Sequence, residues 1–424
     1  FFLCDTMDES VLDKLKILAE SAKYDVSCAS SGTSRGHKAG AIGSAAGWGI
    51  CHSFAEDGRC ISLLKIMLTN YCRYDCAYCI NRRSNDIPRA TLSVTELVNL
   101  TIEFYRRNYI EGLFLSSGVV RNPDYTMERL VRIVKDLRTI HRFNGYIHLK
   151  GIPGASPELI HEAGLYADRM SVNIEIPNEK SLQTLAPEKD FQSVFTPMRH
   201  IQQGVLESSE ERKKHRHAPR FAPAGQSTQM IIGATPDSDK DILRLSSALY
   251  QRPTMKRVYY SGFVPVNAYD NRLPQLKQPP LVRENRLYQA DWLLRFYQFK
   301  VDEIVDDSYP DLDLEIDPKL AWALRHPEKF PVDINRADYE LLLRIPGLGV
   351  KSAKMIIVSR RYGKINGSQL KKMGVVLKKA QYFITCNELP LQTVQELRPE
   401  RVRQLLIPRK GKQEDPRQLK IIFE

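Results

Sequence analysis

The chain has 424 residues, of which 42% are hydrophobic, so its length indicates two or three domains. It has no apolar run of about eighteen residues, which excludes an evident membrane-spanning helix. The first ten residues lack the basic region and the small-residue cleavage site of a secretory signal. We therefore expect a cytoplasmic protein, in which eight cysteines indicate metal binding or redox chemistry rather than disulfides.

Positive charge is concentrated near the C-terminus. The net charge is +12, and residues 331–424 hold nineteen Lys and Arg against nine Asp and Glu. A nearly neutral body with a basic tail favours an acidic polymer as partner. The alternative is a solvated basic surface, which charge alone does not exclude.

The N-terminal segment, residues 1–60, is expected to hold a helix and a loop rich in Gly, Ser and Cys. After it, expected strands alternate with expected helices. The apolar runs are near-continuous, which is typical of parallel strands buried on both faces. Helix start signals stand at Ser93, Ser156-Pro157 and Thr235-Pro236. These units predict an α/β fold, a partial TIM-like (β/α)6 barrel over residues 61–280, with its site on the loops after the strands. The expected strands are Ile61–Leu68, Gly112–Ser117, Tyr146–Lys150, Arg169–Ile176, Thr228–Gly233 and Arg257–Gly262.

Three further segments have distinct expectations. Residues 207–223 are charge-dense and flanked by proline, and we expect a mobile surface insertion. Residues 265–280 are rich in proline and polar residues, and we expect a connector. Residues 281–330 begin with an amphipathic pattern, which predicts a helical linker packing on the barrel.

Three cysteines, Cys72, Cys76 and Cys79, lie within eight residues directly after the first expected strand. Thiolates bind zinc or iron–sulfur clusters. A structural zinc needs four ligands, usually in two separated pairs, and no second pair follows this loop. One loop with three thiolates suits a [4Fe-4S] cluster with one open iron. Zinc and a triplet of buried structural thiols remain as alternatives.

The spacing Cys72-x3-Cys76-x2-Cys79, with Tyr78 before the last cysteine, resembles the signature of the radical S-adenosylmethionine (SAM) superfamily. The resemblance implies that the open iron binds SAM and that reductive cleavage gives a 5′-deoxyadenosyl radical. It also implies an electron donor such as flavodoxin or ferredoxin. Residues at strand ends would then contact SAM, and those that the resemblance suggests are Tyr78, Ser116, Ser117, Gly118, Asn173, Glu175, Ile232 and Gly233. For Asn173, Glu175 and Gly233, a purely structural role is the alternative.

Over residues 7–384 the chain is similar to a family of radical SAM proteins associated with DNA modification or repair. That resemblance implies DNA as partner, with a DNA glycosylase-like protein as a further partner. The reaction of that family is unassigned.

Cys28, Cys51 and Cys60 precede the barrel. One interpretation is that they bind a second iron–sulfur cluster or form a lid, with His52 or His37 as an extra ligand. Their spacing matches no compact motif, so a glycine-rich loop with incidental thiols is the alternative.

Residues 331–424 are expected to form a small all-α domain that resembles a helix-hairpin-helix module. Its hairpin is Ile345–Val350, and we expect Asn335 to cap the first helix. Glycines expose backbone N–H groups where a phosphate can bind, and lysines follow. The expected phosphate contacts are Gly347, Gly349, Val350, Lys351 and Lys354, and residues 366–379 suggest a degenerate second copy. The alternative is a hairpin used for packing or protein contact.

Three functions follow from these patterns. The first is a radical SAM enzyme that modifies or repairs DNA. The second has RNA as substrate, because phosphate contacts do not distinguish the sugar. The third is a non-catalytic iron–sulfur redox factor that binds DNA, although a structural cluster is normally ligated by four cysteines.

Overall fold

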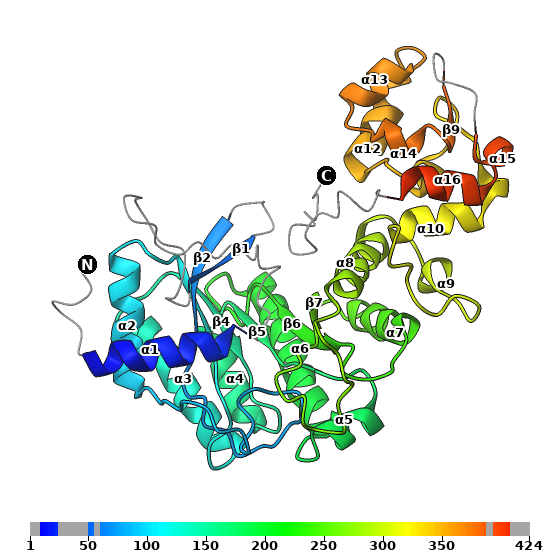
Figure 1. The fold of residues 1–424 in the computed structure, drawn as a ribbon. Helices are drawn as coiled ribbons and strands as arrows, with labels where there is room; N and C mark the ends of the chain where they lie inside the picture. The colour runs from blue at the N-terminus through cyan, green and yellow to red at the C-terminus, as the bar shows by residue number, and fades with distance from the viewer. Residues whose placement is uncertain (1–8, 24–49, 55–59, 387–392, 408–424) are drawn as a thin grey trace, which may run out of the picture. The chain divides into compact units, whose positions relative to one another are not determined.

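The computed structural model describes residues 9–23, 50–54, 60–386 and 393–407 (Figure 1). The chain forms two compact units. The first comprises Phe1–Asp237 and Ala248–Pro280, and the second comprises Ser238–Ser247 and Leu281–Glu424. Within the described residues, no helix is both long enough and apolar enough to span a bilayer.

The first unit is built on one seven-stranded sheet whose strand order follows the chain. β1 is antiparallel to β2, and β2 to β7 are parallel, so the sheet curls into a half-barrel (Figure 1). The six expected parallel strands are therefore confirmed, and β1 is an addition. The strands are β1 Ile50–Phe54, β2 Cys60–Met67, β3 Gly112–Ser116, β4 Tyr146–Lys150, β5 Arg169–Ser171, β6 Gln226–Ile232 and β7 Met255–Gly262.

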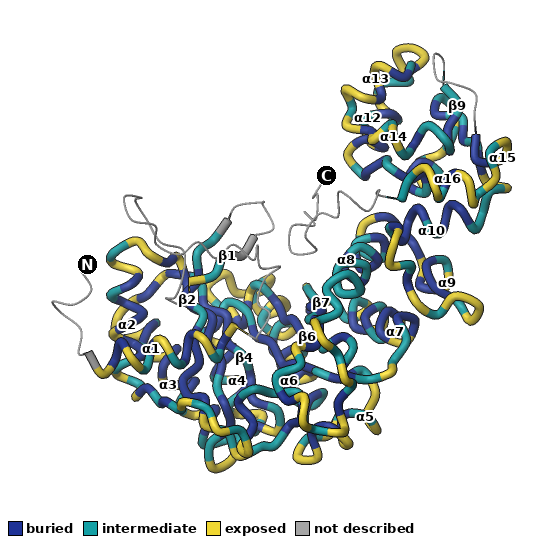
Figure 2. The backbone as a smooth tube through the Cα atoms, in the orientation of Figure 1, coloured by how far each residue is buried: buried dark blue, intermediate teal, exposed yellow. Residues whose placement is uncertain are grey.

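Helices connect the parallel strands and cover the outer face of the sheet, whose residues are largely buried (Figure 2). Ser93 forms the expected capping box at the start of α2, and Pro157 is the first residue of α4. The helices of this unit are α1 Glu9–Ala22, α2 Val94–Arg106, α3 Pro123–Thr139, α4 Pro157–Tyr166, α5 Glu179–Leu185 and α6 Phe191–Lys214. α7 Asp239–Tyr250 connects β6 to β7, and its residues up to Ser247 belong to the second unit.

Three local expectations are wrong. α6 continues to Lys214, so much of the expected insertion is helix, because Glu, Arg and Lys are good helix formers and the last turn is basic. α7 begins at Asp239, beyond Thr235-Pro236. β5 ends at Ser171, and Glu175 takes a positive φ of 64°, a conformation that interrupts regular strand.

The second unit is helical, as expected, with one short parallel pair of strands in addition. Residues 281–330 group with the C-terminal helices in this unit. Its core includes Leu342, Leu343, Ile356 and Leu370, all fully buried. The elements are α8 Leu281–Phe296, α9 Val301–Ile304, α10 Pro318–Arg325, the 3₁₀ helix Pro327–Lys329, β8 Val332–Asp333, α11 Tyr339–Arg344, α12 Val350–Ser359, α13 Gly367–Lys372, α14 Leu377–Ala380, β9 Ile384–Thr385, α15 Val394–Leu397 and α16 Pro399–Leu406.

The expected hairpin joins α11 to α12. Gly347 has a φ of +81°, which glycine adopts without strain, and α12 begins at Val350 as expected. The cap of α11 is Asp338, whose side chain accepts from the Leu341 N–H, so the expectation for Asn335 is wrong. Asn335 instead exchanges two hydrogen bonds with the backbone of Ile365.

Candidate active site

A pocket opens at the carboxyl ends of β2 to β7, and segments that end or follow each of these strands line it. Its empty space, which includes open solvent, is about 1150 Å³. This is the edge of a parallel barrel at which sites are expected. The polar residues of its wall, besides the three cysteines, include Ser21, Asn81, Ser117, Lys150, Asn173, Glu175, Lys189, Gln229 and Ser261.

The three predicted cluster ligands line this pocket together. Cys76 is buried, and Cys72 and Cys79 are partly buried, in the loop that follows β2. The backbone N–H of Val119 lies 3.4 Å from Cys72 Sγ, and the backbone of Asn81 hydrogen bonds to Cys79. Such N–H groups stabilise thiolates, so the loop presents its sulfurs as ligands.

The chemistry of the three thiols fits an iron–sulfur cluster. Burial raises the pKa of Cys76, and burial with the neighbouring cysteines raises the pKa of Cys79 to about 12. A bound iron would supply the positive charge that deprotonates both thiols. Among the described residues, no three His, Cys, Asp or Glu side chains converge on one metal ion, as zinc would need. In a cubane cluster each cysteine ligates a different iron, so Cys72, Cys76 and Cys79 would hold it without converging.

The turn after β3 approaches the cysteine loop closely. A Cβ at Gly118 would lie 2.3 Å from the Tyr71 carbonyl oxygen, so only glycine fits there. The Gly118 N–H donates to the Thr69 carbonyl oxygen at 2.8 Å. This close approach brings the Val119 N–H to the first cysteine.

The connection between α5 and α6 holds the other side of the loop. The Ala77 N–H donates to the Leu185 carbonyl oxygen at 2.7 Å, and the Asp75 N–H donates to Glu188 Oε1 at 3.1 Å. Lys189, the next residue, lines the pocket. Two contacts with backbone groups therefore fix the loop against this connection.

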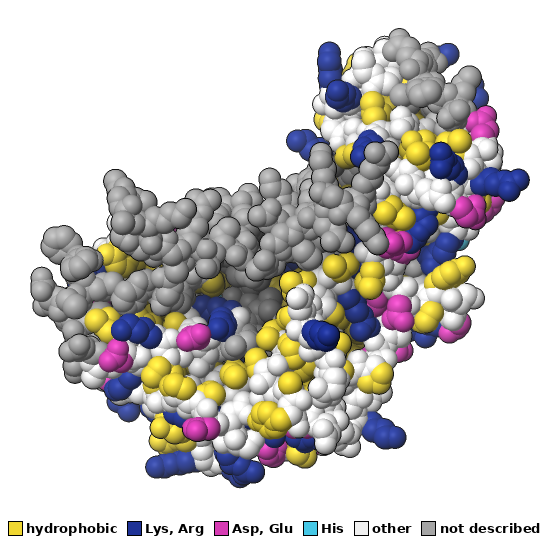
Figure 3. Space-filling model, in the orientation of Figure 1, with side chains coloured by type: hydrophobic (Ala, Val, Ile, Leu, Met, Phe, Trp, Pro, Cys, Tyr) yellow, Lys and Arg dark blue, Asp and Glu magenta, His cyan; other side chains and the backbone are white. Residues whose placement is uncertain are grey.

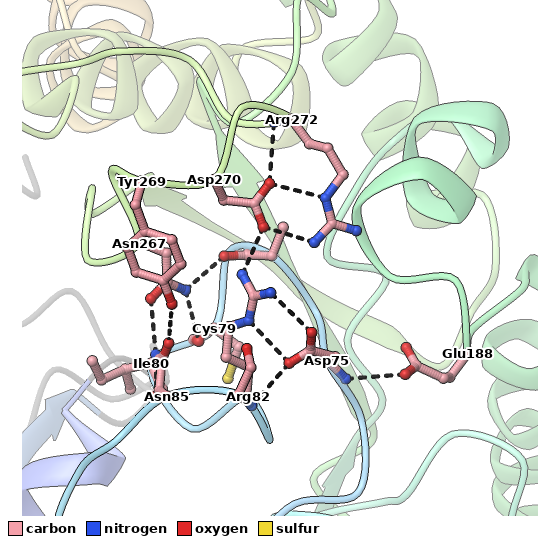
Figure 4. A network of polar contacts seen from close by, with 12 residues as sticks. Asp75, Cys79, Ile80, Arg82, Asn85, Glu188, Asn267, Tyr269, Asp270 and Arg272 are labelled. Atoms are coloured by element: carbon pink, nitrogen blue, oxygen red, sulfur yellow. Dashed lines mark hydrogen bonds and ion pairs between the residues drawn. The ribbon is translucent and has the colours of Figure 1, made fainter.

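The segment after β7 also holds the cysteine loop, as Figure 4 shows. Asn267 is 1% exposed, and its amide donates to the Ala77 and Cys79 carbonyl oxygens at 2.7 and 3.0 Å. Asn85 Nδ2 donates to Asn267 Oδ1 at 2.8 Å. Asn267 thus satisfies the carbonyl oxygens of a loop that has no sheet partner there.

An ion-pair chain reinforces this contact (Figure 4). Arg82, 6% exposed, pairs with Asp75 at 2.9 Å and with Asp270 at 2.7 Å. Arg272 also pairs with Asp270, at 2.7 Å. The segment that we expected to be a connector, residues 265–280, is therefore part of the site, because its polar residues satisfy the cysteine loop.

The predicted SAM residues divide into two groups. Tyr78, Ser117, Gly118, Asn173 and Glu175 line the pocket. The remaining three do not line it. Ser116 is buried at the end of β3, Ile232 is fully buried, and Gly233 has a φ of +84° and faces Pro280. Ile231 and Gln229 line the pocket from β6 instead, because alternate residues of a strand face opposite sides.

Glu175 reaches the pocket in an unexpected way. Although β5 has ended, the Glu175 N–H donates to the Gln229 carbonyl oxygen, and the Ile231 N–H donates to the Glu175 carbonyl oxygen. Its carboxylate lies 3.9 Å from Lys150 Nζ. Asn173 Nδ2 donates to Gln229 Oε1 at 3.2 Å. Hydrogen bonds with β6 hold both residues at one pocket.

Several pocket residues carry no signal in the sequence. Lys150, Lys189 and Gln229 belong to no motif, and only their positions at strand ends or beyond them could have suggested them. Asn81 lies two residues after the last cysteine, and its buried Oδ1 has no hydrogen-bond partner within the described residues. An unpaired acceptor at a pocket wall favours a bound donor group.

The N-terminal cysteines are largely outside the described residues. Cys28 and His37 lie outside them, as do the side chains of His52 and Cys60. Cys51 is in β1, paired with Leu63 of β2, and Cys60 pairs with Phe54. A second cluster or lid at these cysteines stays a prediction.

Residues 66–204 match the family model of the radical SAM superfamily, and this range contains all three cysteines. The chain contains a radical SAM domain. Radical SAM enzymes use a [4Fe-4S] cluster and SAM, so the cofactors of this domain are a [4Fe-4S] cluster and SAM, and its reaction is unassigned. An enzyme is thereby favoured over a non-catalytic redox factor.

Several solved structures are similar to this chain at low identity. The FeFe-hydrogenase maturase from Carboxydothermus hydrogenoformans is 14% identical, with a TM-score of 0.42 over 54% of this chain and 50% of that chain. Methylornithine synthase is 14% identical, with a TM-score of 0.40 over 55% and 61%. Coproporphyrinogen III oxidase from Escherichia coli is 14% identical, with a TM-score of 0.33 over 61% and 56%. The chain spans about half the length of the maturase, and no curated protein sequence matches it.

The predicted phosphate contacts lie in the second unit. Gly347 is in the turn, Gly349 is the N-cap of α12, and Val350 is its first residue. Lys351 and Lys354 are exposed on this helix. The structure therefore brings the predicted hairpin residues together on one short segment.

Proposed function

We propose that this radical SAM enzyme modifies or repairs nucleic acid, with DNA as its substrate, and that the second unit binds the phosphate backbone. The observation that carries the proposal is the turn at Gly347, which leads directly into the basic start of α12. The similarity to a family associated with DNA modification supports the same substrate.

The start of α12 has the features of an anion site. The first N–H groups of a helix lack partners within the helix, and Gly349 provides no side-chain cap. Phosphates bind such N–H groups, which lie at the positive end of the helix dipole. Exposed Lys351 and Lys354 add charge within the first two turns. Contacts of this kind hold a backbone without reading its sequence.

A second helix pair packs against the first hairpin. α13 and α14 are joined through Gly374, which has a φ of +83°. The Val376 N–H donates to the Gly347 carbonyl oxygen at 2.8 Å, and Ser352 Oγ donates to the Met373 carbonyl oxygen at 2.8 Å. Exposed lysines follow on this pair too: Lys371, Lys372 and Lys378. Two adjoining basic hairpins favour contact with several phosphates of one backbone.

Figure 3 shows Lys and Arg side chains on the visible surface of the C-terminal helices.

The cluster and SAM would supply hydrogen abstraction, while residues of this chain hold the cofactors and the substrate. A flavodoxin or ferredoxin would supply the electron, and a DNA glycosylase-like protein is a further proposed partner.

The test is binding of the full-length protein to a labelled DNA duplex across a range of salt concentrations. Lys351→Ala with Lys354→Ala should reduce the salt slope by about two units, one for each lost phosphate contact. Lys213→Ala with Lys214→Ala removes the same charge from exposed positions on α6 and serves as the control. SAM cleavage without substrate should persist in both variants, because the lysines lie outside the radical SAM domain.

The outcomes separate the alternatives. Equal loss in both double variants would show a general charge effect and contradict the hairpin site. Tighter binding and product formation with an RNA duplex of the same sequence would replace DNA by RNA as the substrate. Gly347→Val is an unsuitable probe, because its Cβ would lie 2.7 Å from the Val376 carbonyl oxygen and would disturb the packing of the two hairpins.

A further inference from the structure

Lys189 places a cation in the wall of the cluster pocket. It follows Glu188, whose carboxylate accepts from the cysteine loop, so the backbone at this point is fixed against that loop. Lys189 Nζ lies 3.5 Å from Tyr78 Oη and 5.9 Å from the centre of the Tyr78 ring. Tyr78 immediately precedes the last cysteine. The ammonium group is therefore held beside the loop that carries the sulfurs.

The surroundings of Lys189 favour its charged form. Burial by itself lowers the pKa of a lysine, but nearby Cys76, Tyr78 and Glu175 raise the pKa of Lys189 well above its ordinary value. A lysine is in any case protonated at neutral pH, because its ordinary pKa is about 10.4. The geometry therefore places a positive charge beside the cysteine loop.

The other charges near the loop are already paired. Lys150, the other cation among the described residues of the pocket wall, lies 3.9 Å from the Glu175 carboxylate. Arg82 pairs with both Asp75 and Asp270. Lys189 has no carboxylate within salt-bridge distance among the described residues. The acidic groups that act on it are Cys76, Tyr78, Glu175 and Cys79.

We propose that Lys189 is a positioning residue for electron transfer, whose ammonium stabilises the reduced, more negative cluster and so raises the cluster's reduction potential. A [4Fe-4S] cluster gains one negative charge when it accepts an electron, and net charge nearby is one of the factors that set its potential. A fixed cation in a partly buried pocket favours the reduced form, because attraction there is screened less than in water. A low-potential one-electron donor of the ferredoxin or flavodoxin type would then reduce the cluster more completely.

The inference rests on the radical SAM domain and is independent of the nucleic-acid substrate. Its test is a redox titration of the reconstituted protein without SAM or substrate, followed by electron paramagnetic resonance. Lys189→Met keeps an unbranched side chain that is one atom shorter and removes its charge. At a fixed potential, the ratio of reduced to oxidised cluster should fall on the order of tenfold, equivalent to about 59 mV for a one-electron couple. Lys189→Arg should restore the ratio.

Lys180→Met is the matched control, because Lys180 is exposed on the neighbouring α5 and its change should leave the ratio unaltered. If Lys189→Met builds no cluster, Lys189→Gln keeps a polar end beside Tyr78 and provides the neutral variant. An unchanged midpoint potential at full iron content would overturn the proposal. The proposal would also be overturned if Lys189→Met changed the affinity for SAM but left the midpoint potential without SAM unchanged. Lys189 would then be a SAM-binding residue instead.

Discussion

Asn267 and Arg82 determine how the cysteine loop is held. Both side chains are buried, and each contacts groups far away in the sequence: Arg82 and Asp270 are 188 positions apart. A buried guanidinium that loses a carboxylate keeps its desolvation cost, so each member of the ion-pair chain matters. The loop thus depends on residues that carry no metal ligand themselves.

Asp270→Asn should lower the stability of the folded protein, by an amount that depends on pH. Arg272 and Arg82 hold the pKa of Asp270 well below its ordinary value. A carboxyl group with a lowered folded-state pKa contributes stability above its unfolded pKa of about 3.9, and that contribution is lost as pH falls further. Urea unfolding of the cluster-free protein should therefore show a lower midpoint for the variant at pH 7, and the gap should start to narrow below about pH 3.9 and keep narrowing as the pH falls toward the lowered folded-state pKa.

The control for this experiment is Asp86→Asn, which makes the same charge change at an exposed position nearby. Its midpoint should follow that of the unaltered protein throughout. A gap for Asp270→Asn that does not narrow at all below the unfolded-state pKa would mean that lost packing, and not the ion pair, explains the defect.

At the scale of elements, α4 and α6 pack around one aromatic ring. A Cβ at Gly164 of α4 would lie 2.2 Å from the ring of Phe221, and one at Gly204 of α6 would lie 2.6 Å from it. Phe221 is 3% exposed, and the ring meets both glycines, so it has no free direction in which to move. The two glycines therefore determine how closely these helices approach.

Gly204→Ala should destabilise the first unit. Alanine in a helix is favoured over glycine by about 1 kcal/mol, but overpacking a buried site costs about 1–3 kcal/mol. We expect a net loss of about 1 kcal/mol, measured by urea unfolding with circular dichroism. Gly363→Ala, outside the helices of the second unit, is the comparison without overpacking, because no atom lies within 4 Å of its added Cβ. A neutral or stabilising Gly204→Ala would show that the Phe221 ring can move.

At the scale of the whole molecule, two compact units have separate cores. The first holds the cluster ligands at the end of its sheet, and the second holds the hairpins. Because each unit has its own buried residues, we expect their unfolding to be separable.

Core substitutions should reveal this division. Leu370 in the second unit and Ile133 in the first are both fully buried, and truncation of either to alanine should cost about 2–5 kcal/mol. Leu370→Ala should lower a melting transition seen by circular dichroism without altering loss of the cluster absorbance. Ile133→Ala should shift the cluster absorbance as well. Equal effects of both changes on the cluster would show that the units unfold as one.

The sequence by itself determined the features that local segments encode. Cys72, Cys76 and Cys79 are recognisable because one loop carries all three ligands. The parallel strands follow from near-continuous apolar runs, and the hairpin follows from glycines that a tight turn requires. In each case neighbouring residues are sufficient to produce the pattern.

Only the tertiary structure decided which distant residues complete the site. Lys189 and Asn267 reach the cysteine loop from segments more than a hundred residues away, and nothing in their spacing predicts the contact. Glu175 enters the pocket through hydrogen bonds to β6. Ile231 lines it in place of Ile232, because alternate residues of a strand face opposite sides and the sequence does not show which side faces the pocket. The chain encodes ligands locally, whereas the charges and hydrogen bonds around them arise when strands far apart in sequence converge at one edge.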